Sequence, residues 1–303
     1  MATMPAVSSS STSIDLSRLP APTIVEQLDY ETIRAQLLAK LVELLPSFDA
    51  TIESDPAVKV LEVAAYHELL LRQDFNDRAR QLLVAYATGS NLEALGALFG
   101  VPRLEITPED PTTGAAAVYE DQDAYRQRII LAPESYSVAG PELAYVAHAK
   151  SASANVLDAS AVSPTPGAVL VSVLSAQGDG TAATELVAAV NAIVADPAVR
   201  PLGDQVTTAS ADIVRYEIAA EITTFSGPDL ALVLASARDA LDAYISENRK
   251  LGRNHRRAGI TAALDVVGVE NIVLSSPADD VLCDNTQAAW PTVITLTHAG
   301  YAS

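Results

Sequence analysis

The chain has 303 residues, of which 49% are hydrophobic and only 5% are aromatic, so it is long enough for two or three domains but poor in stacking surfaces for bases. Its net charge of −19 argues against nucleic acid or an anionic membrane as the main partner. The lone Cys283 excludes an intrachain disulfide and favours a reducing compartment. No apolar run approaches a membrane span and no signal peptide precedes the fold, so we expect a protein that is made in the cytoplasm.

The first hundred residues are predicted to be helical after a short polar start. Residues 1–22 include a run of serines and are expected to form a flexible N-terminal tail. Residues 23–102 are predicted to form a helical bundle domain, and its first helix runs from about Asp29 to Leu45.

The most informative stretch is Asp55–Gly89, which is predicted to be one helix of roughly 33 residues, about 50 Å long. Asp55 is expected to cap its start and Gly89 to end it. Apolar residues recur along one line at three- and four-residue steps: Val60, Ala64, Leu71, Phe75, Ala79, Leu82 and Tyr86, with His67 on the same line. The first half is also apolar on other faces, for example through Leu61 and Leu69. We therefore expect this half to lie in a bundle that another chain can complete.

A short helix over Ser90–Phe99 is expected to close the helical domain, because Ser90 and Glu93 have the spacing of a capping box. Residues 103–122 contain prolines, a glycine and several acids without periodicity. We interpret them as a connector between domains.

The rest of the chain is predicted to form two small α/β modules, at residues 123–212 and 213–303. The first is expected to have helices at 141–153 and 182–195, and strands at 156–162, 169–174 and 205–211. The second is expected to have helices at 229–248 and 257–267, and strands at 213–225, 270–275 and 292–297. The predicted fold class is therefore α+β, an N-terminal long-helix bundle followed by two helix-on-sheet modules.

No motif indicates catalysis, a cofactor or a metal, and we expect the protein not to be an enzyme. His67-Glu68 lacks the second histidine, one helical turn later, that a zinc protease motif requires, so His67 is interpreted as a hydrogen-bonded core residue. The turn Gln177–Gly180 lacks both the three-glycine dinucleotide pattern and the lysine of a P-loop. Asp74 and Asp77 have arginines at helical spacing and are interpreted as surface ion pairs, not calcium ligands.

Five of the nineteen basic residues fall within nine positions: Arg249, Lys250, Arg253, Arg256 and Arg257. One interpretation is a solvated helix C-terminus, where cations interact favourably with the helix dipole. The other is a docking site for an acidic patch on a neighbouring subunit. Nucleic acid is disfavoured because the remainder of the chain would repel it. Together with Leu61 and Leu69, these five residues are the predicted partner interface.

The stretch from Asp55 to Val101 resembles the baseplate assembly protein J family. Further matches occur in family order and extend the resemblance over nearly all of residues 16–298: LPAPTIVEQLDYETI, YRQRIILAPESYSVAGPE, DASAVSPTPGAVLVSVLS, RPLGDQV and LSSPADDVLCDNTQAAW. No single stretch is a chemical motif, and the specificity comes from the number and order of the matches.

This resemblance implies a structural wedge subunit of the baseplate in a contractile-tailed phage or a tail-like bacteriocin. The implied partners are a wedge protein with a lysozyme-like fold, a tail protein of the I type, further copies of this chain around a six-fold ring, and the central hub and spike. The family's long N-terminal helices contribute to a bundle between subunits, and its ring opens on host attachment to release sheath contraction. The implied location is the baseplate of a virion or tail-like particle, assembled in the bacterial cytoplasm.

Two other functions remain open from the residues alone. One is a tail assembly factor that is absent from the finished particle, and the other is an enzyme with an unrecognised pocket. Presence in finished particles would separate a structural subunit from an assembly factor.

Overall fold

The computed structural model describes residues 20, 23–49, 54–227 and 229–302. The described chain divides into two compact units, one that ends at Pro102 and one that begins at Arg103. The tail expected at residues 1–22 lies almost wholly outside the described residues. No helix within the described ranges combines the length and the apolar character that a membrane span requires.

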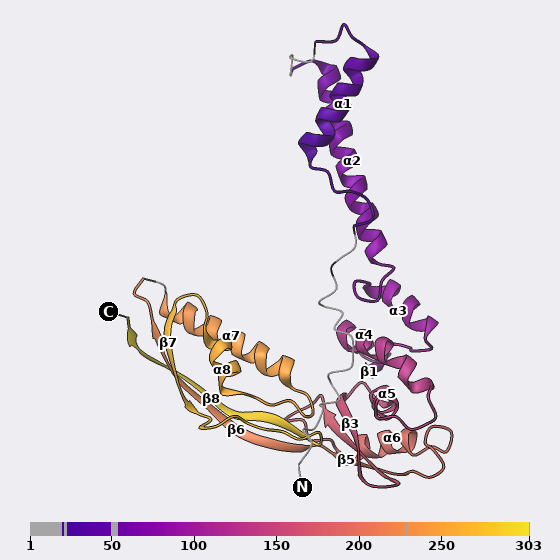
Figure 1. The fold of residues 1–303 in the computed structure, drawn as a ribbon, viewed down its shortest axis with the longest axis vertical. Helices are drawn as coiled ribbons and strands as arrows, with labels where there is room; N and C mark the ends of the chain where they lie inside the picture. The colour runs from indigo at the N-terminus through magenta and orange to yellow at the C-terminus, as the bar shows by residue number, and fades with distance from the viewer. Residues whose placement is uncertain (1–19, 21–22, 50–53, 228, 303) are drawn as a thin grey trace. The chain divides into compact units, whose positions relative to one another are not determined.

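The first unit contains three helices: α1 (Tyr30–Leu44), α2 (Pro56–Arg80) and α3 (Gly89–Leu98). Asp29 caps α1 by accepting a hydrogen bond from the Thr32 amide at 2.8 Å, and Asp55 caps α2 through the Ala57 amide at 2.7 Å. Helices α1 and α2 pack side by side (Figure 1). Within the described residues, α1 and α2 form a two-helix hairpin. The long-helix bundle that another chain can complete stays a prediction.

The prediction that α2 continues to Gly89 is wrong, because the helix ends at Arg80 and a series of turns follows. The side-chain oxygen of Gln81 accepts a hydrogen bond from the amide of Thr88 at 2.9 Å, which holds the two ends of these turns together. Gly89 has a left-handed backbone, with φ of +53°, and it begins α3 instead of ending α2. The expected capping box is also absent, since Thr88 is the N-cap residue of α3 and makes no side-chain cap bond.

The segment interpreted as a connector contains an antiparallel hairpin of β1 (Glu105–Thr107) and β2 (Val118–Tyr119). It leads into α4 (Gln122–Leu131) and the 3-10 helix η3 (Ala132–Tyr136). The buried carboxylate of Glu120 accepts hydrogen bonds from the Leu104 amide at 2.7 Å and from Arg128 of α4 at 2.8 Å. This ion pair ties the base of the hairpin to α4.

The first three-stranded sheet has the order β3-β4-β5. Its elements are α5 (Glu142–Ala152), β3 (Val156–Thr165), β4 (Ala168–Ser175), α6 (Thr184–Val194) and β5 (Gln205–Ser210). Strands β3 and β4 are antiparallel, whereas β4 and β5 are parallel. Side chains from α5 and α6, including Tyr145, Val190 and Val194, form one core with those of the sheet.

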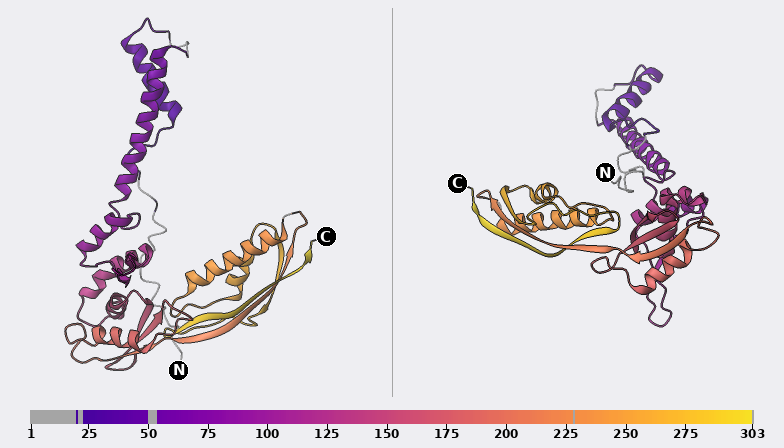
Figure 2. Two further views of the ribbon diagram at one scale, coloured as in Figure 1. Left: turned by 180° about the vertical axis from the view of Figure 1, so that it is seen from behind. Right: turned by 60° about the horizontal axis from the view of Figure 1, so that its bottom comes forward.

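The second three-stranded sheet has the order β7-β6-β8. Its elements are β6 (Asp212–Thr224), α7 (Leu230–Asn248), α8 (Arg257–Leu264), β7 (Val269–Ser276) and β8 (Gln287–Tyr301). Strand β6 is antiparallel to β7 and parallel to β8. Figures 1 and 2 show α7 and α8 on the same face of this sheet, where Leu241 and Ile260 pack against Ile218. Strand β8 is more than twice as long as the strand predicted at 292–297.

The two sheets follow each other with only Ala211 between β5 and β6. A small buried cluster joins them, with Leu174 from β4 and Ile213, Leu251 and Ala288 from the second module. The second unit is therefore a continuous body of two helix-on-sheet layers, as the α+β prediction requires.

Candidate partner interface

Helix α2 carries a row of large apolar side chains that are exposed to solvent. We call this row the open α2 face, and it consists of Val60, Val63, Tyr66, Leu70, Leu71 and Phe75. Their exposed fractions run from 42% at Leu70 to 70% at Val63. Val60, Val63, Tyr66 and Leu70 recur at three- and four-residue steps, and Leu71 and Phe75 are four residues apart. The six positions therefore form two adjacent lines on one side of the helix. Contiguous exposed apolar surface of this kind is typical of protein-binding surfaces.

The opposite side of α2 packs against α1. Val58 and Ala65 are buried there, as is Ile33 of α1. Leu61 and Leu69 are half-buried on this same side. The structure thus places these two predicted interface residues within the hairpin, whereas the apolar residues left exposed are those of the open α2 face. Helical spacing in the sequence could not show which of these two sides packs against α1, because both sides are apolar.

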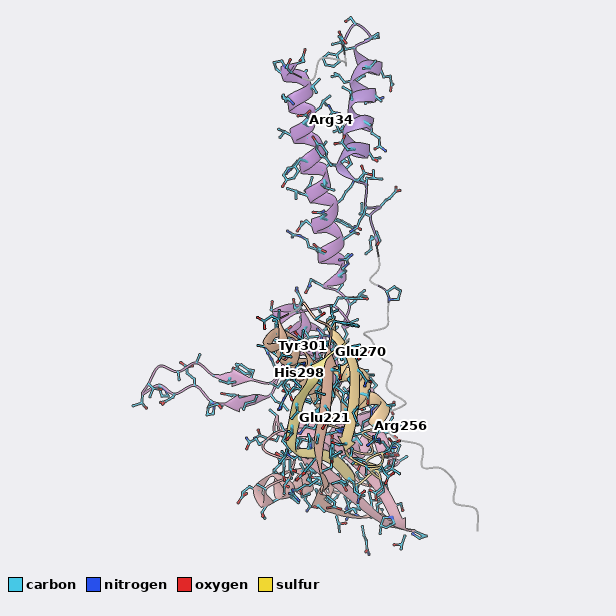
Figure 3. The ribbon with its side chains drawn as sticks, turned by 90° about the vertical axis from the view of Figure 1, so that its left-hand side faces the viewer. Arg34, Glu221, Arg256, Glu270, His298 and Tyr301 are labelled. Atoms are coloured by element: carbon cyan, nitrogen blue, oxygen red, sulfur yellow. The ribbon has the colours of Figure 1, made fainter. Side chains whose placement is uncertain are left out.

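Polar contacts also hold the hairpin together. Arg34 of α1 and Glu62 of α2 form an ion pair at 3.4 Å (Figure 3 labels Arg34). The side chain of Asn76 is buried and binds the chain that precedes α1. Its oxygen accepts from the amides of Ile24 and Val25 at 3.0 and 2.9 Å, and its nitrogen donates to the carbonyl of Val25 at 2.8 Å. These bonds cover the second half of α2 on its α1 side and leave the open α2 face uncovered.

His67 is exposed, so its interpretation as a core histidine is wrong. It lies on the line of Val60, Val63 and Leu71, which the chain itself does not cover. The ion pairs predicted for the acids near the end of α2 are confirmed, with Arg78 at 2.7 Å from Asp74 and Arg80 at 3.2 Å from Asp77.

The five basic residues after α7 fall into two groups. Arg249 and Arg257 bind backbone carbonyls of their own chain. Arg249 donates to Gly178 at 2.8 Å and to Ser175 at 3.3 Å, and Arg257 donates to Leu274 at 2.8 Å and also to Pro277. These two side chains therefore stabilise the fold.

Lys250, Arg253 and Arg256 are exposed. Arg253 donates to the side-chain oxygen of Asn248 at 2.9 Å, which holds it near the end of α7. Lys250, Arg253 and Arg256 (the last labelled in Figure 3) therefore carry the exposed positive charge of this cluster. Of the predicted basic interface, these three residues are the ones whose positions suit contact with another chain.

The turn Gln177–Gly180 is a structural contact between the two modules. Its Gly178 carbonyl accepts a hydrogen bond from Arg249, and Asp179 forms an ion pair with Arg215 of β6. Hydrogen bonds from Thr181, and then from Arg215, lower the pKa of Asp179 to about 2. The carboxylate therefore stays charged at neutral pH and keeps its partner.

Sequence reasoning did not find a buried polar group around His255. This imidazole is fully buried, and its Nδ1 lies 2.6 Å from the hydroxyl of Tyr216. Its Nε2 lies 3.3 Å from the carbonyl of Asn248, and burial lowers the pKa of His255. The contacts join the end of α7 to β6, which is a packing role. The residues of this group are far apart in the sequence and come together only in the folded chain. No local sequence motif could therefore have predicted it.

Among the described residues, no group of three or more His, Cys, Asp or Glu side chains could hold a metal ion. Burial, and then the nearby Asp284, raise the pKa of the half-buried Cys283 thiol to about 11. The thiol is therefore protonated at neutral pH and is a poor nucleophile. Two extended features of the described surface are the open α2 face and the exposed basic residues.

Comparison with known proteins accounts for nearly the whole chain. The Baseplate J-like N-terminal domain matches residues 53–110, the Baseplate J-like central domain matches residues 137–210, and the Baseplate J-like protein C-terminal domain matches residues 216–298. The chain is also 42% identical over 288 residues to baseplate protein J of Escherichia phage P2, which covers 92% of this chain and 95% of that protein. The chain therefore belongs to the baseplate J-like protein family.

Proposed function

We propose that this protein is a structural wedge subunit of a contractile-tail baseplate. The observation that carries the proposal is the match to a phage baseplate protein over almost the full length of both chains. An aligned region this long includes all three family domains, so it covers both compact units of the structure. The protein belongs, on this proposal, to the baseplate of a virion or a tail-like particle that is assembled in the bacterial cytoplasm.

The open α2 face supports a role in assembly. Six large apolar side chains on a helix favour contact with an apolar face of another helix. We propose that α2 joins a helical bundle with neighbouring wedge proteins, namely the lysozyme-like-fold wedge protein and the tail protein of the I type. Leu61 and Leu69 then hold α2 against α1 within this chain. The open α2 face makes the contact with the neighbouring proteins.

We propose that the second unit contacts further copies of the chain around a six-fold ring, and also the hub and spike. Lys250, Arg253 and Arg256 suit an acidic patch on a neighbour, since this chain itself carries a net charge of −19. Such charged contacts are reversible and sensitive to ionic strength. A ring held partly in this way could change its packing on host attachment and release sheath contraction.

We propose no catalytic role. The buried titratable groups around His255 face other parts of the protein core, and the cysteine thiol is protonated at neutral pH. The chemistry of the described residues thus supports packing and partner contact.

The experiment that tests this function is disruption of the gene, followed by electron microscopy of the particles that the strain produces. Loss of contractile tails, with recovery when the intact gene is supplied in trans, is the expected result. Normal tails without the gene would overturn the proposal. Supplying a gene with Val63→Asp and Leu71→Asp gives a sharper comparison, since we expect this variant to fold but not to restore tails.

A further inference from the structure

Strand β8 forms one edge of the second sheet and is its longest strand. It spans Gln287–Tyr301 and pairs along its length with β6. Within the described residues, no other strand pairs with the outer side of β8. An edge strand of this length offers a row of backbone N–H and C=O groups to another strand.

The edge is also free of charge. Residues 285–303 contain no Asp, Glu, Lys or Arg, although the whole chain has 38 acidic and 19 basic residues. Proteins commonly protect edge strands with charged side chains, and lysine above all. The opposite edge, β7, is about half as long and begins beside Glu270 (Figure 3). The open edge of β8 is therefore the one that lacks this protection.

One side chain of another element contacts the β8 backbone weakly. Arg238 of α7 lies 3.5 Å from the carbonyl of Ile294, at the limit of a hydrogen bond. Its main partner is Asp242, at 2.8 Å, which neutralises it. Both side chains are about half exposed, so Arg238 can leave the carbonyl without losing its ion pair.

The side chains of β8 are arranged almost symmetrically about Thr295. Its neighbours Ile294 and Leu296 are both apolar and half-buried, and they pack against the core under α7. The next pair, Val293 and Thr297, are both exposed on the outer face and both β-branched. An antiparallel copy of this strand, centred on Thr295, would therefore place apolar side chains opposite each other on the core face. It would place β-branched side chains opposite each other on the outer face.

We propose that β8 pairs antiparallel with β8 of a second copy of this chain, with the two-fold axis at Thr295. In this register Ile294 lies opposite Leu296 of the second copy, and Val293 lies opposite its Thr297. The two three-stranded sheets then form one six-stranded sheet. A contact of this type is closed, because each copy uses the same surface.

The lack of charge explains why a second copy fits this edge. Two chains of net charge −19 repel each other over most of their surfaces, and the repulsion is smallest where neither contributes a charged side chain. Cross-strand pairs of β-branched and apolar residues add stabilisation. The pairing would also cover the half-buried side chains of Ile294 and Leu296. This contact rests on the proposed function, because it names the strand through which the second unit meets a further copy of the chain.

Disulfide trapping tests the register directly. In a background with Cys283→Ser, Thr295→Cys places two thiols opposite each other across the proposed axis. The matched control is Asn271→Cys, because Asn271 is also exposed but lies on β7, the other edge of the same sheet. We expect Thr295→Cys to form covalent dimers about tenfold faster than the control under mild oxidation, because pairing raises the effective thiol concentration. Equal rates for the two variants would overturn the proposal.

Charge variants provide an independent measurement on the intact chain. Thr295→Lys places two like charges opposite each other and is expected to weaken dimerisation about tenfold in sedimentation velocity. Asn271→Lys adds the same charge on the other edge and is expected to have no effect. A mixture of Thr295→Lys and Thr295→Asp should recover the dimer, since the two charges attract across the axis. Failure of the mixture to recover it would contradict the register, and would do so even if particles assembled normally and the proposed function stood.

Discussion

The guanidinium of Arg249 lies over the indole ring of Trp290, with 4.6 Å between its central carbon and the ring centre. The same guanidinium donates to the carbonyls of Gly178 and Ser175 in the other module. One side chain at the end of α7 therefore binds β8 and the turn after β4 together. The sequence predicts that Arg249 belongs to a partner interface, whereas the contacts that the structure gives it are with its own chain.

Replacing Arg249 with Gln is expected to destabilise the junction between the two modules. The variant loses the contact with Trp290 and two carbonyl bonds, which together cost about 2 kcal/mol. A lower midpoint of thermal unfolding and faster amide hydrogen exchange at residues 175–180 would show this destabilisation. Lys250→Gln is the matched control, because it removes the same charge from an exposed neighbour. Equal effects of the two substitutions would contradict the structural role of Arg249.

The two sides of α2 are expected to respond differently to charge. Leu61→Asp with Leu69→Asp puts carboxylates into the contact with α1, and each should cost about 2 kcal/mol of hairpin stability. Val63→Asp with Leu71→Asp changes only exposed positions and should leave helix content intact. Circular dichroism and co-purification with co-expressed wedge neighbours measure both effects. We expect both pairs to lose co-purification, but only the first pair to lose helicity. Retained co-purification of the second pair would exclude the open α2 face as the contact.

Arg256 and Arg257 are adjacent but are expected to act differently when their charge is reversed. Arg257→Glu removes donors from the carbonyls of Leu274 and Pro277, so it should destabilise the second module by about 2 kcal/mol. Arg256→Glu changes an exposed residue and should leave the thermal midpoint unchanged. Its effect should appear as weaker assembly at low salt, where charged contacts are least screened. Unchanged assembly at low salt would leave Arg256 as an ordinary surface charge.

Stability is expected to fall on acidification because of His255. Burial lowers its pKa below the ordinary value of 6.5, so the unfolded chain takes up a proton that the folded chain does not. The imidazole faces the hydroxyl of Tyr216 and the carbonyl of Asn248, and Arg253 lies nearby. The contribution of His255 to the free energy of unfolding is fully present above the pKa of the unfolded chain. It is lost as the pH falls from that pKa toward the lower pKa of the folded chain.

The measurement is urea unfolding at about pH 7.5 and about pH 5.5, values that bracket the ordinary histidine pKa. His255→Gln should reduce the difference in unfolding free energy between the two conditions. Part of the difference should persist, because burial also lowers the pKa of His148. His67→Gln, which removes an exposed imidazole, serves as the control. A pH dependence that His255→Gln leaves unchanged would show that this residue does not titrate on unfolding.

Elements with clear local signals could be predicted from the sequence. Helix α7 was expected at 229–248 and is found at Leu230–Asn248, since Asp229 caps it through the Ala231 amide. Strands β4 and β5 were expected within a residue or two of their ends for similar reasons, because turns with glycine and proline delimit them. The α+β class followed from these elements.

Features that depend on distant contacts could not be predicted. The end of α2 is set by Gln81, whose side chain binds the Thr88 amide, and the apolar line continues past this point without a break. Exposure of His67 depends on which side of α2 receives α1, and periodicity gives no preference between two apolar sides. The roles of Arg249 and Arg257 depend on carbonyls that lie far away in the sequence.

Mass spectrometry of purified particles tests the central claim most directly. A structural baseplate subunit must be present in finished tails, in a constant ratio to the other tail proteins and resistant to washing with salt. We predict this result. Absence of the protein from intact, contractile tails, in a strain that needs its gene to make them, would contradict a structural role and would identify an assembly factor.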